Sequence, residues 1–334
     1  MEQPRPIRWG IAGTGQMAST FASDFEYADG AELVAVGSRS DLGAERFARQ
    51  HSVPRPHGSY RALIEDPDVD VIYVATPHPQ HFEVARAAIE AGKPVVIEKS
   101  FTATYSGAAR LVELARERGV FLMEAMWTRF LPAVAYARDL VESGEIGTVQ
   151  LVQADLGAYR AFDPSSRLFD PELGGGATLD VGVYVVAIAQ LFLGAPARVR
   201  AVGTRYENGV DATVAITLEY DDGRAASLAA SLESQTPGRA VVMASGGSIE
   251  FEPRFHHPDS IVVQHNAQQP QRLKFSNRGR GYAHEIMAVS DDLRAGRTES
   301  EIMPLDATLA EQQTLQQVLD ALGIATAEDE NVPV

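Results

Sequence analysis

Short apolar runs alternate with amphipathic stretches over the first part of the chain. The runs have the length of β-strands, and the stretches between them repeat apolar residues every three or four positions, as a helix with one buried face does. Regular alternation of this kind is typical of a doubly wound parallel sheet with right-handed crossovers. The pattern therefore predicts an α/β domain over residues 1–124, with strands at residues 7–12, 32–37, 69–75, 93–98 and 120–124.

The alternation stops beyond about residue 130. A helix is predicted over residues 132–143, and from residue 148 short strand patterns alternate with glycine-containing turns. Residues 225–232 are small or apolar on both faces, which a sheet with one solvated face does not need. We therefore predict a second, α+β domain over residues 125–334, built on an open, mostly antiparallel sheet with one face left for a second subunit.

The end of the chain is predicted to be mainly helical. One helix begins at Tyr282, and another over residues 305–322 carries leucine and valine on one face. The acidic stretch that starts at Glu328 has no such pattern, which indicates a frayed tail.

Composition narrows the class of protein. A length of 334 residues, 45% hydrophobic and 22% charged, fits a folded protein of two domains. The net charge of -16 disfavours nucleic acid and anionic membranes as partners. No cysteine is present, which excludes disulfides, thiolate zinc sites and cysteine nucleophiles. The longest apolar run, residues 181–194, is shorter than the roughly 20 residues of a membrane span. With no leader-like opening, we expect a soluble, cytoplasmic protein.

The adjacent pair His256-His257 is the main candidate for a metal site. Neighbouring residues on a strand point to opposite faces, and no carboxylate at a suitable spacing completes a ligand set. We therefore expect no metal.

A glycine-rich turn follows the first predicted strand and opens the first predicted helix. It has the G-x-G-x-x-A form of a dinucleotide-binding fingerprint, in which the first glycine permits a tight turn and the second lets the backbone approach a pyrophosphate. The small sixth residue lets helix and strand pack closely. The candidate cofactor residues here are Gly13, Thr14, Gly15, Gln16 and Met17, followed by Ala18.

The end of the second strand indicates which dinucleotide binds. An acid at this place would bind a free ribose 2′-hydroxyl, but the sequence offers Ser38, Arg39 and Ser40. Hydroxyls and a guanidinium suit a 2′-phosphate. We therefore favour NADP, with NAD still open; the alternative is that Arg39 is only a solvated residue.

Further candidates follow the next two strands. Thr76 and Pro77 break one of them, and His81 is predicted to open the following helix. Glu98 and Lys99 end the other, after an apolar run. Because ligands bind outside the carboxyl ends of the strands in an open α/β sheet, all of these residues fall where a ligand would bind.

The second domain supplies one more candidate surface. Three glycines, residues 174–176, predict a close backbone approach or a sharp entry to the helix that begins near Thr178. On that helix Asp180 and Tyr184 stand four residues apart, so they share a face. The alternatives are that Asp180 only balances the helix amino end and that Tyr184 is a core residue.

Together these motifs resemble the Gfo/Idh/MocA oxidoreductases, named for glucose-fructose oxidoreductase and inositol dehydrogenase. The likeness covers nearly the whole chain, and residues 123–130 with Tyr184 look most like the branch that contains dimeric dihydrodiol dehydrogenase and glucose-fructose oxidoreductase. Ser100 stands where the family usually has proline after Glu-Lys. The resemblance implies a Rossmann domain, a homodimer or larger homo-oligomer, and cofactor contacts from Glu98, Lys99, Trp127 and Arg129 in addition to those above.

The resulting hypothesis is hydride transfer between NADP(H) and a secondary alcohol or carbonyl of a sugar, polyol or vicinal diol. Tyr184 would donate or accept the proton, Lys99 would hold the reacting oxygen, and Asp180 would orient the substrate or the lysine. In an alternative assignment Lys99 itself is the acid/base. The second hypothesis, from another class, is a nicotinamide-binding regulator or redox sensor without turnover.

Overall fold

The computed structural model describes residues 5–334, which divide into two compact units. The first contains residues 5–127, 278–308 and 327–334; the second contains residues 128–277 and 309–326. Two segments from the end of the chain thus return to the first unit. The sequence did not predict this return, since its proposed division at residue 124 cuts the chain only once.

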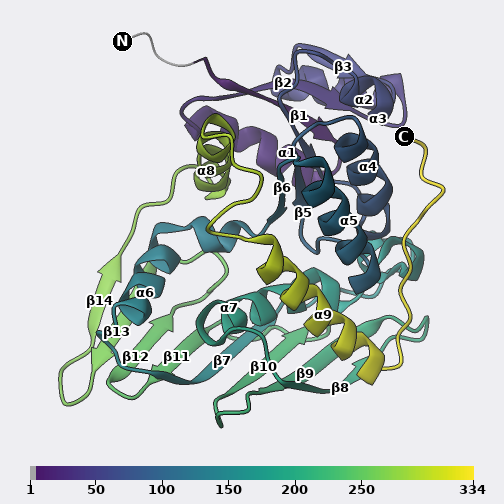
Figure 1. Ribbon diagram of the computed structural model, residues 1–334. Coiled ribbons are helices and arrows are strands. Elements are labelled where there is room, and N and C mark those ends of the chain that lie inside the picture. Colours follow the sequence, from purple (N-terminus) through teal and green to yellow (C-terminus); the bar gives the residue numbers. More distant parts are fainter. Residues whose placement is uncertain (1–4) are drawn as a thin grey trace. The chain divides into compact units, whose positions relative to one another are not determined.

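The first unit is built on a six-stranded parallel sheet with the order β3-β2-β1-β4-β5-β6. This confirms the predicted doubly wound sheet (Figure 1). The strands are β1 (Ile7–Ala12), β2 (Ala31–Gly37), β3 (Arg55–His57), β4 (Val71–Val74), β5 (Val95–Glu98) and β6 (Leu122–Ala125). Its helices are α1 (Gln16–Ser23), α2 (Asp41–His51), α3 (Tyr60–Ile64), α4 (His78–Glu90), α5 (Tyr105–Arg118) and α8 (Tyr282–Arg294).

Helix α8 belongs to this unit because aromatic packing and one buried carboxylate hold it there. The ring centroid of Phe21 lies 6.1 Å from that of Tyr282 in α8, and Trp9 Nε1 donates to Ser290 Oγ of α8 at 3.2 Å. Asp24, only 1% exposed, accepts from the backbone N–H of Tyr282 at 2.8 Å and so caps the amino end of α8.

One helix begins earlier than predicted. Helix α4 begins at His78, after Pro77, so His81 lies one turn inside it rather than at its start. Helix α5 begins at Tyr105, and the side chain of Thr104 caps it. Ser40 caps α2, accepting from Gly43 N at 3.2 Å.

The second unit is built on an eight-stranded sheet with the order β14-β13-β12-β11-β7-β10-β9-β8. Only β10 and β7 pair in parallel, so the predicted mostly antiparallel sheet is confirmed. The strands are β7 (Val149–Gly157), β8 (Arg198–Arg205), β9 (Asp211–Glu219), β10 (Ala225–Ser231), β11 (Ala240–Ala244), β12 (Gly247–Phe251), β13 (Ser260–His265) and β14 (Gln271–Lys274). Helices α6 (Pro132–Glu142), α7 (Val183–Leu193) and residues 309–321 of α9 (Leu305–Ala321) complete the unit.

One helical segment is longer than the sequence pattern predicted. By length and composition alone the 23 residues Pro171–Leu193 could cross a membrane, so the argument from length was wrong, although glycines 174–176 interrupt the helical turns. Of the most apolar window of this segment, 89% is buried inside the structure.

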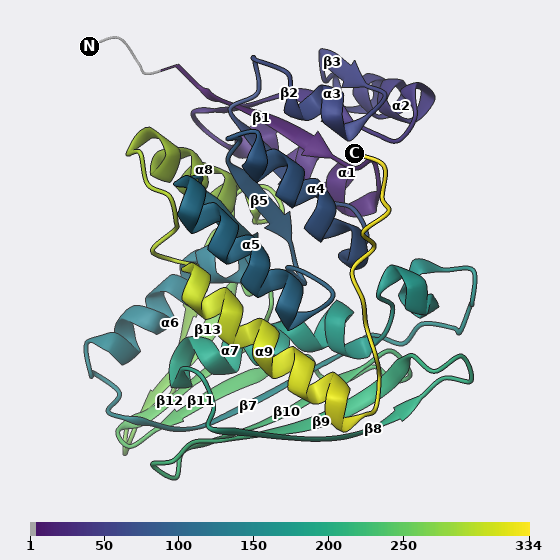
Figure 2. The same ribbon diagram turned by 45° about the vertical axis from the view of Figure 1, so that its right-hand side comes forward.

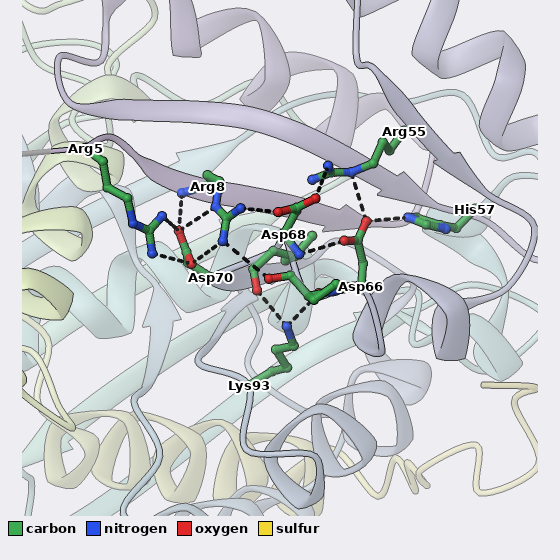
Figure 3. A network of polar contacts seen from close by, with 10 residues as sticks. Arg5, Arg8, Arg55, His57, Asp66, Asp68, Asp70 and Lys93 are labelled. Carbon is green, nitrogen blue, oxygen red and sulfur yellow. Dashed lines mark hydrogen bonds and ion pairs between the residues drawn. The ribbon is translucent and has the colours of Figure 1, made fainter.

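An ion-pair network joins the amino ends of β1 and β4 in the first unit (Figure 3). Arg5 Nη1 donates to Asp70 Oδ2 at 2.8 Å, and the backbone N–H of Arg8 donates to the same oxygen at 2.9 Å. Below the network, Lys93 Nζ donates to the carbonyls of Asp66 and Val69, each at 2.7 Å. These bonds fix the loop that leads into β4.

Replacing Asp70 with asparagine is expected to lower the free energy of unfolding at pH 7 by about 1–3 kcal/mol, the usual worth of hydrogen bonds to a charged group. Burial opposes ionisation, but the bonds from Arg5 and Arg8 outweigh it and hold the pKa of Asp70 well below its ordinary value of 3.8. The unfolded chain therefore takes up the proton first. The stabilisation is complete above about pH 5 and is lost as the pH falls through 4 and below.

Urea unfolding of wild type and Asp70→Asn at pH 7 and at pH 3 measures this difference. The difference in free energy of unfolding between wild type and Asp70→Asn should be smaller at pH 3, because Asp70 is then partly protonated in the unfolded wild type. Asp68→Asn is the control, since that side chain is 52% exposed and should matter less. A gap that is the same at both pH values would contradict the charge argument.

Candidate active site

The turn after β1 has the geometry of a dinucleotide cradle. Gly13 has a φ of 118°, and a Cβ there would lie 2.7 Å from the carbonyl oxygen of Ala75, so only glycine fits. At Gly15, which precedes α1, an added Cβ would meet no atom of residues 5–334 within 4 Å beyond its neighbours in the chain, and this N-cap residue has no side chain to cap the helix. This open space and the helix amino end fit a pyrophosphate. Thr14, Gln16 and Met17 lie on the same turn and are at least partly exposed.

The carboxyl end of β2 carries Ser38, which is buried, and Arg39, which is exposed. Within residues 5–334 the Arg39 guanidinium forms no ion pair with a carboxylate. A guanidinium of this kind, with no acid beside it on the strand end, fits a 2′-phosphate better than a 2′-hydroxyl.

The loops after β4 and β5 are joined by His81, which is completely buried. Its Nε2 lies 2.7 Å from the carbonyl oxygen of Thr76, and its Nδ1 lies 3.1 Å from that of Ser100. The ring therefore bridges the segment that contains Thr76 and Pro77 to the segment that follows Lys99. Its predicted contact with the cofactor stays a prediction.

Lys99 directly follows β5 and is 8% exposed. The preceding Glu98 accepts a hydrogen bond of 2.5 Å from the hydroxyl of Tyr73. In the β4–β5 pairing Tyr73 lies opposite Val96, so Tyr73 and Glu98 share a face of the sheet. The structure thus places a buried amine at the edge of the sheet where ligands bind, and its catalytic role stays a prediction.

Sequence reasoning missed a buried carboxyl group near Glu98. Glu285 of α8 is 0% exposed, and neither of its carboxyl oxygens has a hydrogen-bond partner in residues 5–334. Burial and the carboxylates of Glu98 and Glu124 raise the pKa of Glu285 well above its ordinary value. The folded protein therefore favours the protonated acid. A glutamate inside a mostly apolar helix pattern, Tyr282 to Val289, was the available signal.

The two candidates after β6 fall in different units. Trp127 belongs to the first, where its ring stacks on Tyr282 at 4.3 Å. Arg129 belongs to the second and forms a buried ion pair with Glu311, whose side chain is 0% exposed. The structure thus shows a protein partner for Arg129, and the cofactor role of both residues stays a prediction.

In the second unit the three glycines make the predicted close approach. A Cβ on Gly175 would lie 2.7 Å from the carbonyl oxygen of Leu168, and Gly176 has a φ of 121°. Asp211 of β9 then accepts from Thr178 Oγ1 at 2.7 Å and from Thr178 N at 2.5 Å. This buried carboxyl group fixes the start of the helical segment that carries the candidate catalytic residues.

Asp180 and Tyr184 lie on one continuous helical segment. Asp180 is in the π-helical turn Thr178–Gly182, and Tyr184 is in the first turn of α7. Single π-helical turns are frequent at functional sites because they re-aim side chains. Arg167 Nη2 donates to Asp180 Oδ1 at 3.1 Å, a partner that the sequence pattern did not indicate.

Tyr184 is 8% exposed and its ring lies 4.9 Å from that of His256. His256 and His257 were expected on a strand, but they lie in a turn before β13, because Pro258 and the preceding turn interrupt the ladder. Their rings are 4.6 Å apart, so the argument from opposite strand faces was wrong. Among residues 5–334 no group of three or more histidine or acidic side chains is arranged to hold a metal ion.

Two family models match this chain. The model described as "Oxidoreductase family, NAD-binding Rossmann fold" matches residues 7–126, and the "GFO/IDH/MocA C-terminal domain" model matches residues 134–250. The chain belongs to the Gfo/Idh/MocA family. Both domains of the family are therefore present, in the order that the sequence predicted.

Whole-length relatives are trans-1,2-dihydrobenzene-1,2-diol dehydrogenases. The protein from Bos taurus is 32% identical over 336 residues, covering 97% of this chain and 99% of the relative. The protein from Sus scrofa is 34% identical over 338 residues, with the same coverage. This likeness supports the predicted branch of the family.

Solved structures agree with the fold. A 3-ketoreductase from Actinomadura kijaniata, in complex with NADP and TDP-benzene, has a TM-score of 0.82 at 27% identity, covering 95% of this chain and 98% of the other. The aldose-aldose oxidoreductase from Caulobacter crescentus has a TM-score of 0.86 at 23% identity, covering 96% and 98%. Because these relatives are dehydrogenases and reductases, this chain is an NAD(P)-dependent oxidoreductase acting on CH–OH groups.

Proposed function

We propose that the protein transfers hydride between NADP(H) and a secondary alcohol or carbonyl group of a sugar, polyol or vicinal diol. The observation that carries the proposal is the buried Lys99 at the carboxyl edge of a sheet whose glycine turn fits a dinucleotide. The substrate class is supported by relatives named for a dihydrodiol and for an aldose. NADP over NAD is supported by Arg39 and by the NADP complex of the 3-ketoreductase.

Each residue has a separate part in the proposed reaction. When bound, the nicotinamide supplies or accepts the hydride. The Tyr184 hydroxyl donates a proton to the substrate oxygen or takes one from it. Lys99 stabilises negative charge on that oxygen and on the tyrosinate. Asp180, paired with Arg167, orients the substrate or the lysine.

Two alternatives remain distinct from this assignment. Lys99 could be the acid/base itself, which is consistent with its burial. A non-catalytic regulator is disfavoured because the matching relatives are named dehydrogenases and reductases. The 3-ketoreductase was also solved with a lysine changed to alanine and with a tyrosine changed to phenylalanine, two residue types that match the proposed pair.

A coupled spectroscopic assay tests the function. The purified protein with NADP and a panel of sugars, polyols and trans-diols should produce reduced cofactor with at least one compound. The reverse reaction with NADPH and the matching ketones or aldoses covers the other direction. Cofactor binding without turnover on any compound in either direction would favour the regulator.

Replacing Arg39 with alanine is expected to weaken NADP binding by roughly 10- to 100-fold, because a charge-assisted contact to phosphate is worth about 1.5–3 kcal/mol. The affinity for NAD should change less than threefold. Titration of both cofactors by fluorescence measures the two dissociation constants. Arg61→Ala, an exposed arginine on the neighbouring helix α3, is the control. Equal weakening of NADP and NAD would remove the phosphate role.

We also propose a homodimer, formed by the exposed face of the sheet in the second unit. Every second residue of β9 is exposed or half-buried on this face of the sheet. The residues between them are buried on the opposite face. The side chains on this exposed face are small and uncharged where Ala215 pairs with Val202 of β8 and with Ala229 of β10. Val202 is 72% exposed, unusual for an apolar side chain on a strand. A cytoplasmic location stays a prediction.

Replacing Ala215 with arginine is expected to convert a dimer of this chain to a monomer, since the added charge would be buried at the centre of the interface. Light scattering coupled to size-exclusion chromatography measures the mass. Thr217→Ala should leave the mass unchanged. A wild-type protein that is already monomeric at micromolar concentration would contradict the proposal.

A further inference from the structure

The acidic end of the chain is packed on the first unit, not frayed as the sequence indicated. Figures 1 and 2 show the yellow C-terminal segment running beside α4. Residues 327–334 form neither a helix nor a strand, yet Val332 is only 7% exposed. A segment without regular structure that is held in place must be held by its side chains and by isolated backbone bonds.

We propose that residues 327–332 are a clasp that fixes the loop following Lys99 against the amino end of α4, with Glu328 as a positioning residue for Lys99. The proposal rests on the proposed function, because it matters for catalysis only if Lys99 acts on substrate. The ordering of the loop by the clasp does not depend on whether the protein turns over a substrate.

Glu328 holds the end of the loop that carries Lys99. Its Oε1 accepts from Thr104 N at 2.8 Å and from Thr104 Oγ1 at 2.7 Å, and its Oε2 accepts from Ala103 N at 3.4 Å. Thr104 is the residue that caps α5, accepting in turn from Gly107 N at 3.0 Å. The carboxyl group therefore sits at the amino end of α5, where negative charge is favoured.

The packing around Glu328 is close. A Cβ on Gly107 would lie 2.3 Å from Glu328 Oε1, so any other residue at 107 would displace the carboxyl group. Burial raises the pKa of Glu328 to about 7, against the bonds from Thr104 and Ala103 and the charge of Arg110. Glu328 is half-buried, so its carboxyl group lies partly desolvated against the loop.

The next residue, Asp329, binds the amino end of α4. Asp329 N donates to the carbonyl oxygen of Pro79 at 2.8 Å, and Gln80 Nε2 donates to Asp329 Oδ2 at 3.4 Å. Both acceptor and donor belong to the first turn of α4, directly after Pro77. Two adjacent residues of the tail thus bind the loop before α5 and the first turn of α4, which are about twenty positions apart in sequence.

The same two loops are joined on their inner side by His81, which bonds to the carbonyls of Thr76 and Ser100. The clasp is therefore a second, outer connection between segments that carry the candidate cofactor residues Thr76 and Pro77 and the candidate catalytic Lys99. Loss of the clasp would remove the bonds from Glu328 to Ala103 and Thr104 and those from Asp329 to Pro79 and Gln80. A displacement of about 1 Å at a reacting group can cost on the order of 100-fold in rate.

The test uses full-length Glu328→Ala and Glu328→Gln, with Glu330→Ala as the matched control. Glu330 lies two residues away and forms an exposed ion pair with Arg110 at 3.2 Å. Hydrogen exchange of the amides of residues 100–104, kcat, KM for substrate and thermal unfolding are measured for each variant.

We expect Glu328→Ala to speed exchange at residues 100–104 and to lower kcat by on the order of 10-fold with KM for substrate nearly unchanged. Glu328→Gln keeps an oxygen acceptor, so its exchange rate at residues 100–104 and its kcat should both lie close to wild type. Glu330→Ala should match wild type in both. Unchanged exchange at residues 100–104 in Glu328→Ala overturns the clasp, whatever the activity. Faster exchange with unchanged kcat overturns the positioning role. If Lys99→Ala keeps normal turnover, the proposed function of Lys99 is refuted instead. The exchange measurement on Glu328→Ala still tests the clasp in that case.

Discussion

Replacement of Lys99 by alanine is expected to lower kcat/KM by about 10³-fold or more, the combined range for a lost acid/base group and a lost electrostatic contact to a developing oxyanion. The dissociation constant for NADP should change little, because the glycine turn and Arg39 are untouched. The two quantities are measured by steady-state kinetics and by fluorescence titration. The large effect follows from the place of Lys99, which is 8% exposed at the end of β5.

Lys93 provides the matched control, since it lies just before the other end of the same strand. Its Nζ donates to two backbone carbonyls, so Lys93→Ala should lower stability and leave kcat/KM within about threefold of wild type. Loss of activity in both variants, together with lower thermal stability, would show that Lys99→Ala acts through the fold. Lys99→Ala with normal turnover would refute its assignment.

The parallel sheet and its ligand-binding edge could be predicted because each depends on local sequence. Apolar runs followed by Gly13, Thr76 and Lys99 fix strand ends, and ends of parallel strands meet at one edge of a sheet. The positive φ of Gly13 and the close approach at Gly175 likewise follow from glycine itself. These features need no knowledge of distant residues.

What could not be predicted depends on partners far apart in sequence. Asp24 caps a helix that begins at Tyr282, and Glu328 binds Thr104, the residue that caps α5. An acid near the end of a chain has the same local pattern whether it is solvated or buried, so the tail was taken as frayed. The pairing of Asp180 with Arg167 and the contact of Tyr184 with His256 were missed for the same reason.

Replacement of Tyr184 by phenylalanine is expected to lower kcat by about 10²- to 10⁴-fold, because the variant loses a positioned proton donor and keeps the ring. The ring packing on His256 should persist, so thermal stability should remain close to wild type. Tyr206→Phe is the control. The hydroxyl of Tyr206 has no hydrogen-bond partner in residues 5–334, and its ring is held by Phe162 at 4.9 Å.

The pH dependence of Tyr184→Phe separates the two candidate proton donors. If the Tyr184 hydroxyl carries the proton, the limb of the kcat/KM profile that reports its ionisation disappears in the variant, and the residual rate no longer follows it. If Lys99 is the acid/base, the limb stays at the same pH and only its height falls, because Tyr184 then contributes a hydrogen bond. Two interacting groups titrate as a pair, so the pH dependence of kcat/KM must be measured for Lys99→Ala as well as for Tyr184→Phe. Retention of the same limb in both variants would exclude both residues as the proton donor and move the search to His256, the ring that lies against Tyr184.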